Sequence, residues 1–271
     1  MRISAKTNIC LIIGDPVAQS LSPQMHNAGY ETLGIDDKFV FLATRIVPKD
    51  LEAVIKGLRT MQVKGITVTH PHKIAVMQYL DIVDETAEKI GAVNTIVNNG
   101  GVLTGSNTDW IGVVDAIEKI TSLRDKKVAL IGAGGAARAA VYGVITKGAQ
   151  ATIFNRTVGK AEEIAREFNC NFASLDELEK IKDKDIIINL TPVSMDNKSL
   201  IDKNLLTEKH IVFDAVYAPY ETPLLQAAKE KGARIIHGTE WLLYQGLAQF
   251  EIYTERKAPE DEMRKILMEN I

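Results

Sequence analysis

Polar side chains that can bind a small acid come soon after the first apolar run of the chain. Ser20 and Ser22 follow the run 8–13, and two hydroxyls at positions i and i+2 beside a helix start can hold a carboxylate. The alternative is that Ser22 only caps the helix whose first position Pro23 occupies. That alternative accounts for Ser22 but not for Ser20, and spacing alone leaves both open.

A second group of polar residues follows the later apolar runs. Thr69 and Lys73 are four residues apart, where the end of a strand is followed by the start of a helix, so both can point into one pocket at the carboxyl edge of a sheet. The alternative for Lys73 is a solvated helix lysine. Asn94 interrupts an apolar β-branched run, and a buried amide there needs hydrogen-bond partners. Asp109 precedes an apolar-periodic helix over 110–120, where its simpler role is that of an N-cap.

A glycine-rich turn follows the buried apolar run 128–131. Its pattern, G-x-G-G-x-A, allows a tight turn close to a phosphate and close packing of the next helix on the sheet. The helix N-terminus then offers unpaired N–H groups and a positive dipole end to a dinucleotide pyrophosphate. The residues of this predicted cofactor turn are Gly132, Ala133, Gly134, Gly135 and Ala136.

The end of the next apolar run, 151–154, predicts the choice of cofactor. An enzyme that uses NAD places an acid there on the ribose, whereas this chain has Asn155, Arg156 and Thr157, with Lys160 one helical turn on. Arg156 can hold a 2′-phosphate, and a hydrogen bond to a charged group contributes about 1.5–3 kcal/mol. We therefore expect NADP as the cofactor; the alternative is a surface arginine at a helix start.

Strands and helices alternate along most of the chain, which predicts an α/β protein with largely parallel sheets. A chain of 271 residues is long for one domain and comfortable for two. A hairpin turn is expected at 98–101. The expected strands are 8–13, 38–43, 65–69, 128–131, 151–154, 185–190, 210–216 and 233–237, and the expected helices are 48–61, 84–90, 110–120, 158–168, 241–253 and 261–268.

Composition narrows the class of protein. With 46% hydrophobic residues, 25% charged residues and a net charge of −3, the sequence is typical of a soluble globular protein, and it has no basic stripe for nucleic acid. We expect no nucleic-acid partner, no membrane span or signal peptide, and a cytoplasmic location. Cys10 and Cys170 are far apart, and His70 and His72 lack a third ligand, so no metal site is predicted.

Taken together, these stretches resemble the shikimate dehydrogenase (shikimate/quinate dehydrogenase) family along nearly the whole chain. Seven motifs occur in the family's order. They are GDPVAQSLSPQMHN (14–27), TVTHPHK (67–73), GAVNT (91–95), NTD (107–109), GAGGAAR (132–138), NRT (155–157) and the YQG around Gln245.

The resemblance implies an activity and assigns roles. The family reduces 3-dehydroshikimate to shikimate reversibly with NADPH, on the route to chorismate and the aromatic amino acids. By the resemblance, Ser20, Ser22 and Tyr217 would hold the substrate carboxylate. The ring hydroxyls would be surrounded by Thr69, Lys73, Asn94, Asp109 and Gln245. Lys73 and Asp109 would be the catalytic pair, and Gly238 would lie near the nicotinamide.

The implied architecture has two domains. An α/β substrate domain with a mostly parallel sheet spans residues 1–108 and is completed by 239–271, and a Rossmann NADP-binding domain occupies 109–238. Substrate and nicotinamide would meet in the cleft, in a monomer or a homodimer.

Two departures from the family pattern stand out. Thr67 occupies a position where the family often has asparagine, and Gly238-Thr239-Glu240-Trp241 replaces the common Gly-Leu-Gly-Met. Two other functions also remain open: a broader quinate/shikimate dehydrogenase that uses NAD or NADP, and a non-catalytic sensor of NADP(H) and a metabolite.

Overall fold

The computed structural model describes residues 3–271, which form two compact units. The first contains residues 3–108 and 245–270, and the second contains Asp109–Tyr244. The division near the C-terminus falls inside one helix, α8 (Gly238–Thr254), six residues later than the predicted boundary at 238/239.

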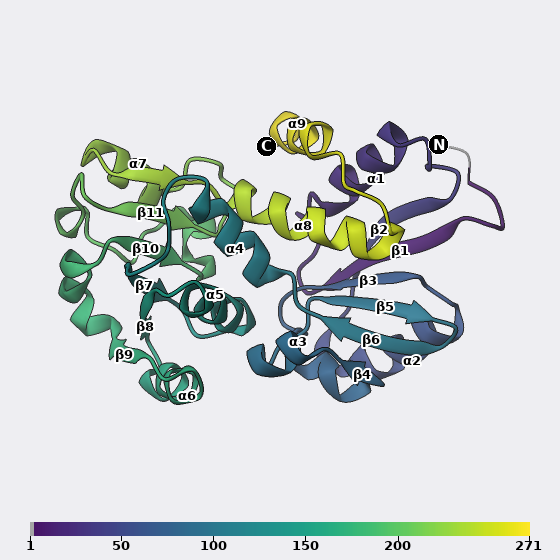
Figure 1. Ribbon diagram of the computed structural model, residues 1–271, viewed down its shortest axis with the longest axis horizontal. Helices are drawn as coiled ribbons and strands as arrows, with labels where there is room; N and C mark the ends of the chain where they lie inside the picture. The colour runs from purple at the N-terminus through teal and green to yellow at the C-terminus, as the bar shows by residue number, and fades with distance from the viewer. Residues whose placement is uncertain (1–2) are drawn as a thin grey trace. The chain divides into compact units, whose positions relative to one another are not determined.

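The first unit is built on a six-stranded mixed sheet (Figure 1). Its strands in spatial order are β2 (Phe39–Arg45), β1 (Asn8–Gly14), β3 (Gly65–Val68), β5 (Thr95–Asn99), β6 (Val102–Ser106) and β4 (Ile82–Val83). β1 pairs in parallel with β2 and β3, and β4 with β6, whereas β3–β5 and the β5–β6 hairpin are antiparallel. The helices are α1 (Ser22–Thr32), α2 (Leu51–Thr60), α3 (Glu85–Ile90) and α9 (Glu260–Glu269), together with the second half of α8.

Alternation along β1 distributes its side chains to both faces of this sheet, because successive strand residues point to opposite sides. Leu11 and Ile13 pack with the apolar residues of α2 and α3. The other face carries α1 and the second half of α8, and α9 packs against α1 (Figure 1). There His26 of α1 lies stacked on Phe41, with ring centroids 4.3 Å apart.

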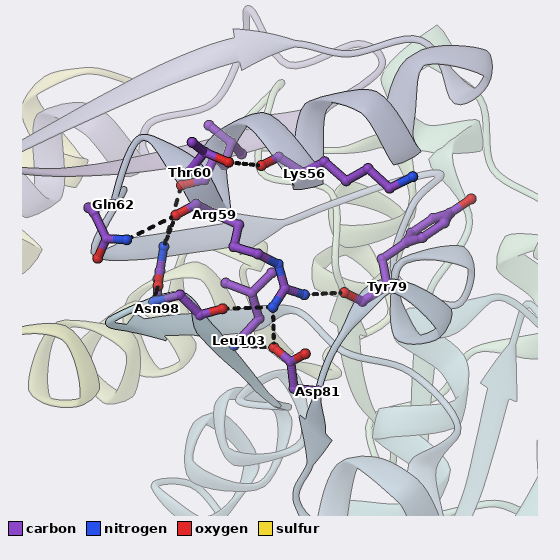
Figure 2. Close-up of polar contacts among 10 residues, drawn as sticks. Lys56, Arg59, Thr60, Gln62, Tyr79, Asp81, Asn98 and Leu103 are labelled. Carbon is purple, nitrogen blue, oxygen red and sulfur yellow. Dashed lines mark hydrogen bonds and ion pairs between the residues drawn. The ribbon is translucent and has the colours of Figure 1, made fainter.

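A cluster of hydrogen bonds around Arg59 links the last turn of α2 to neighbouring segments of the first unit (Figure 2). The Arg59 guanidinium donates to Asp81 Oδ2 at 2.5 Å, to the Gly101 carbonyl at 2.6 Å and to the Tyr79 carbonyl at 3.1 Å. Asn98 accepts from the Gly101 N–H and donates to the Arg59 carbonyl. One cluster therefore joins the last turn of α2, the β5–β6 turn and the segment before β4.

The second unit has a fully parallel six-stranded sheet. Its strands in spatial order are β12 (Arg234–Ile236), β11 (Ile211–Asp214), β10 (Ile186–Asn189), β7 (Lys127–Ile131), β8 (Gln150–Asn155) and β9 (Asn171–Ser174). Its helices are α4 (Asp109–Glu118), α5 (Gly135–Thr146), α6 (Val158–Phe168), α7 (Pro223–Glu230) and the first half of α8. Numbered within the unit, the strand order is 3-2-1-4-5-6, which is that of dinucleotide-binding Rossmann folds.

The expected α/β class with parallel-rich sheets is confirmed. Three expectations for local structure were wrong. The N-cap of α1 is Leu21, and Ser22 is already in the helix and makes no capping bond. Asp109 is the first residue of α4 rather than the residue before it. After Thr69 the chain enters a 3₁₀ helix only at Ala75–Tyr79.

Candidate active site

In the first unit, the loops after β1 and β3 lie side by side at one edge of the sheet. The Thr69 N–H donates to the Ile13 carbonyl at 2.9 Å, and the Asp15 N–H donates to the His70 carbonyl at 2.9 Å. A Cβ added to Gly14 would lie only 2.3 Å from Thr69 Cγ2. Only glycine permits this close approach of the two loops.

Ser20 and Ser22 lie where the β1 loop enters α1. Ser22 is 1% exposed and Ser20 is half-buried, and the Ser22 N–H donates to Ser20 Oγ at 3.3 Å. Ser22 does not cap α1, so the capping alternative does not explain this residue. The first turn of α1 carries no acidic residue that would repel an anion.

The backbone holds Lys73 between two neighbouring segments. The His72 N–H donates to the Thr69 carbonyl at 3.0 Å, and the Lys73 carbonyl accepts from the Val93 N–H at 2.8 Å. His72 is 1% exposed, and its Nε2–H donates to the Ile46 carbonyl at 2.7 Å, so this histidine has a structural partner. Lys73 itself is half-buried, unlike a fully solvated helix lysine.

Asn94 lies beside the end of β3, because its carbonyl accepts from the Val68 N–H at 2.7 Å. The amide is 1% exposed and finds the partners that burial demands: Thr95 Oγ1 and the Thr108 N–H each donate to Oδ1 at 2.8 Å. The backbone bonds of Val68 and Val93 thus bring Thr69, Lys73 and Asn94 to the same end of the sheet.

Gln245 is the first residue of the half of α8 that belongs to this unit. The side chain is 7% exposed, and the following residue, Gly246, packs directly on α1. A Cβ on Gly246 would lie 2.1 Å from Met25 Cε. This contact holds Gln245 close to the helix that Ser22 begins.

In the second unit, the glycine turn joins β7 to α5 at the point where the strand order reverses. Gly132 has φ +121°, and a Cβ there would lie 3.3 Å from the Leu190 carbonyl. Gly134 occupies the N-cap of α5 without a side-chain cap, and the first turn contains no acid. No N-cap side chain therefore bonds to the N–H groups of the first turn of α5, and no acid of that turn would repel an anion. A pyrophosphate site requires both conditions.

The segment after β8 presents two cations. Asn155 Nδ2 donates to the Thr157 carbonyl at 2.9 Å, which shapes the turn that carries Arg156. Arg156 and Lys160 are exposed, and neither side chain has a hydrogen bond or an ion pair within residues 3–271. Both can bind an added phosphate without breaking an existing bond.

The start of α8 contacts Asp109 and the segment that precedes Tyr217. Trp241 Nε1–H donates to the Asp109 carbonyl at 3.0 Å, and Asp109 is 3% exposed. A Cβ on Gly238 would lie 2.6 Å from the Ala215 carbonyl, two residues before Tyr217. Burial raises the pKa of the Tyr217 phenol, which keeps it protonated as a hydrogen-bond donor.

Comparison with known proteins identifies the family. The sequence matches three families: the shikimate dehydrogenase substrate binding domain over residues 12–96, shikimate / quinate 5-dehydrogenase over 115–209, and the shikimate 5'-dehydrogenase C-terminal domain over 238–268. It is 40% identical to a shikimate dehydrogenase (NADP(+)) of Methanosphaera stadtmanae, over 99% of each chain. The chain belongs to the shikimate dehydrogenase family.

Solved shikimate dehydrogenases have the same fold. A crystal structure of one in complex with NADP+ superposes with a TM-score of 0.93 at 39% identity, covering 99% of this chain and 97% of the other. The Thermus thermophilus enzyme in complex with NADP(H) and shikimate gives 0.90 at 31% identity, covering 98% and 100%. The resemblance inferred from the seven motifs is confirmed.

Sequence reasoning did not predict the hydrogen bonds that three other side chains make to the candidate site residues or their neighbours. Thr108 and Gln249 bond to Asn94 or its neighbour, and Trp241 bonds to Asp109. For Gln249, the available signal was its place among apolar residues of α8, because a buried polar group there needs hydrogen-bond partners.

A buried carboxylate in the second unit was also missed. Asp214 ends β11, is fully buried, and accepts from Asn189 Nδ2 at 2.9 Å, Ser194 Oγ at 2.6 Å and Thr222 Oγ1 at 2.7 Å. These bonds fix the segments after β10 and β11. Its signal was an aspartate directly after the apolar run IVF.

Proposed function

We propose that this protein is an NADP-dependent oxidoreductase that reversibly reduces 3-dehydroshikimate to shikimate, a step toward chorismate and the aromatic amino acids. Relatives with this name match it over nearly the full chain. The observation that carries the proposal is that the ends of β1 and β3 and the segment before β5 hold hydroxyls, an amide and a lysine together. Such neutral donors with one cation suit a hydroxyl-rich acid.

We assign most of the substrate contacts to residues of the first unit and NADP to the second. Ser20 and Ser22, with Tyr217, would bind the carboxylate, and Thr69, Asn94 and Gln245 would bind ring hydroxyls. The first turn of α5 would bind the pyrophosphate, and Arg156 and Lys160 the 2′-phosphate. The absence of an acid after β8 supports NADP, since a carboxylate there would repel that phosphate.

Lys73 and Asp109 would perform the proton chemistry. NADPH supplies a hydride when bound, and hydride addition to a ketone leaves negative charge on the oxygen. The Lys73 ammonium would polarise the carbonyl and deliver a proton to that oxygen as charge develops. Asp109 would orient the ammonium. In the reverse direction, neutral Lys73 would accept the hydroxyl proton.

We also propose a cytoplasmic enzyme that is a monomer or a homodimer. Cys10 and Cys170 are free thiols, as a reducing compartment leaves them. Within residues 3–271, no helix has both the length and the apolar character that a membrane crossing needs.

A substrate and cofactor panel tests the proposal. Purified protein is assayed for reduction of NADP+ and of NAD+ with shikimate and with quinate, by nicotinamide absorbance. We expect the highest kcat/KM with shikimate and NADP+. Preference for quinate or NAD+ would support the broader dehydrogenase instead. Shikimate binding by calorimetry without any reduction would support a sensor.

A further inference from the structure

A buried series of hydrogen bonds runs through the first unit from α8 to Asn94. Its members, all at most 3% exposed, are Tyr253, Thr67, Gln249, Thr95, Asn94 and Thr108.

The orientation of the Asn94 amide follows from its partners. The Thr108 backbone N–H can only donate, and it lies 2.8 Å from one amide atom, which must therefore be Oδ1. Thr95 Oγ1 donates its single proton to the same Oδ1 at 2.8 Å. The other amide atom is thus Nδ2, which donates one of its two N–H groups to Thr108 Oγ1 at 3.0 Å.

The direction of the remaining bonds follows in turn. Thr95 donates its only hydroxyl proton to Asn94, so toward Gln249 the Thr95 oxygen can only accept. The Gln249 atom at 3.1 Å from Thr95 Oγ1 must therefore be the donor Nε2. The same Nε2 lies 3.4 Å from the Asn94 carbonyl, an acceptor only, which agrees with this orientation. Gln249 Oε1 is therefore left to accept from Thr67 Oγ1 at 3.2 Å.

The series begins at Tyr253. The single Thr67 proton is used on Gln249, so the 2.9 Å contact between Thr67 Oγ1 and the Tyr253 hydroxyl is donated by the phenol. Burial raises the pKa of this phenol, so it keeps the proton that it donates. Every bond from Tyr253 to Asn94 Oδ1 therefore points one way.

We propose that Thr67, Gln249 and Tyr253 are positioning residues that hold Thr95 as a donor to Asn94 Oδ1. Together with the Thr108 N–H, this donor keeps the amide oriented so that Asn94 offers the substrate its second Nδ2–H. The site then recognises one ring hydroxyl of shikimate as a hydrogen-bond acceptor. This inference rests on the proposed function, because it takes Asn94 as a substrate residue. The three residues act through Asn94 and do not touch the substrate themselves.

Three substitutions test the series at different bonds. Tyr253→Phe removes only the first donor, and Thr67→Val removes the hydroxyl while keeping the shape. Gln249→Glu replaces the Nε2 donor by an acceptor, so the Thr95 proton turns toward Glu and away from Asn94. Thr67→Ser, which keeps the hydroxyl, is the matched control and should behave like wild type.

The readout is kcat/KM for shikimate, 4-deoxyshikimate and 5-deoxyshikimate, with KM for NADP+ measured on the same preparations. We expect each of the three variants to lose about five- to tenfold with shikimate, the effect of one net hydrogen bond. The loss should disappear with the one deoxy substrate that lacks the hydroxyl bound by Asn94, because coupled partners are not additive. KM for NADP+ should stay unchanged, which also reports a folded cofactor unit.

Three outcomes with these variants overturn the inference. They are an equal loss with all three substrates, no loss in any of the three variants, and a Thr67→Ser variant as impaired as Thr67→Val. Failure of the proposed function is distinguishable, since wild type would then not reduce NADP+ with shikimate at all. An Asn94→Ala variant with full discrimination between the three substrates would remove Asn94 as the recognising group and overturn the inference too.

Discussion

Replacing His26 with phenylalanine should make the protein more resistant to acid. His26 is fully buried in α1, is stacked on Phe41, and has no hydrogen-bond partner for either ring nitrogen among residues 3–271. Burial lowers its pKa from 6.5 to about 3. His26→Phe keeps an aromatic ring in the stack and removes the titrating group.

The sign follows from proton linkage. As pH falls through 6.5, the unfolded chain binds a proton at this histidine while the folded chain binds it only near pH 3. Stability is therefore lost progressively between these two pKa values, at up to about 1.4 kcal/mol per pH unit. From about pH 7.5 to about pH 4.5, wild type should lose about 2–3 kcal/mol more than His26→Phe.

Urea unfolding of both proteins at a series of pH values measures this difference. The comparison is between pH dependences, so a constant packing cost of the larger ring cancels. His70→Gln, which removes an exposed histidine, is the control and should follow wild type. Parallel stability curves for wild type and His26→Phe from neutral pH to pH 4.5 would refute the reasoning.

Three further substitutions probe the cofactor turn, the α2 cluster and the start of α8. Arg156→Ala should lower kcat/KM with NADP+ about ten- to a hundredfold and leave NAD+ unaffected, and an equal loss with both cofactors would contradict its role. Arg59→Met should cost about 1–3 kcal/mol in urea unfolding through its lost carbonyl contacts. The Leu103 N–H and Arg59 lower the pKa of Asp81. The part of the stability loss that involves Asp81 should therefore be present at neutral pH and fade as pH falls below about 4. A loss that grows in acid would contradict this role of Asp81. Trp241→Phe should lower the free energy of unfolding by about 1 kcal/mol, and it should lower kcat rather than raise KM for shikimate. A change in KM alone would argue against a link between Trp241 and Asp109.

The sequence predicted the elements whose signals are local. The run 128–131 with its glycines became β7 and the start of α5, because a buried parallel strand and a tight turn each need a distinctive composition. The Asn98–Gly101 turn became the β5–β6 hairpin, with φ of +61° and +95° at its two glycines.

Elements with weak local patterns were missed or misplaced. β9 and α7 are short and were not predicted, and the segment after Thr69 was expected to turn helical sooner than it does. Ser22 had the composition of an N-cap, yet the chain enters α1 one residue earlier because Leu21 already has helical φ and ψ.

Contacts between distant segments lay beyond sequence reasoning. Gln249 and Thr95 are 154 residues apart, and their hydrogen bond depends on how α8 packs on the sheet. Asn94 was recognised as an amide in need of partners, but the partners, Thr108 and Thr95, follow only from the fold. The sequence pattern thus located Asn94, and the packing of the fold determined its hydrogen-bond partners.

Shikimate-dependent NADP+ reduction by Lys73→Met tests the central claim most directly. Methionine keeps most of the bulk of lysine and removes the ammonium that would exchange a proton with the substrate oxygen. We expect kcat to fall about 10²–10⁴-fold while KM for shikimate changes less than about tenfold. A variant that keeps kcat within about threefold of wild type, or that loses activity only through KM, would contradict Lys73 as the proton-transferring group.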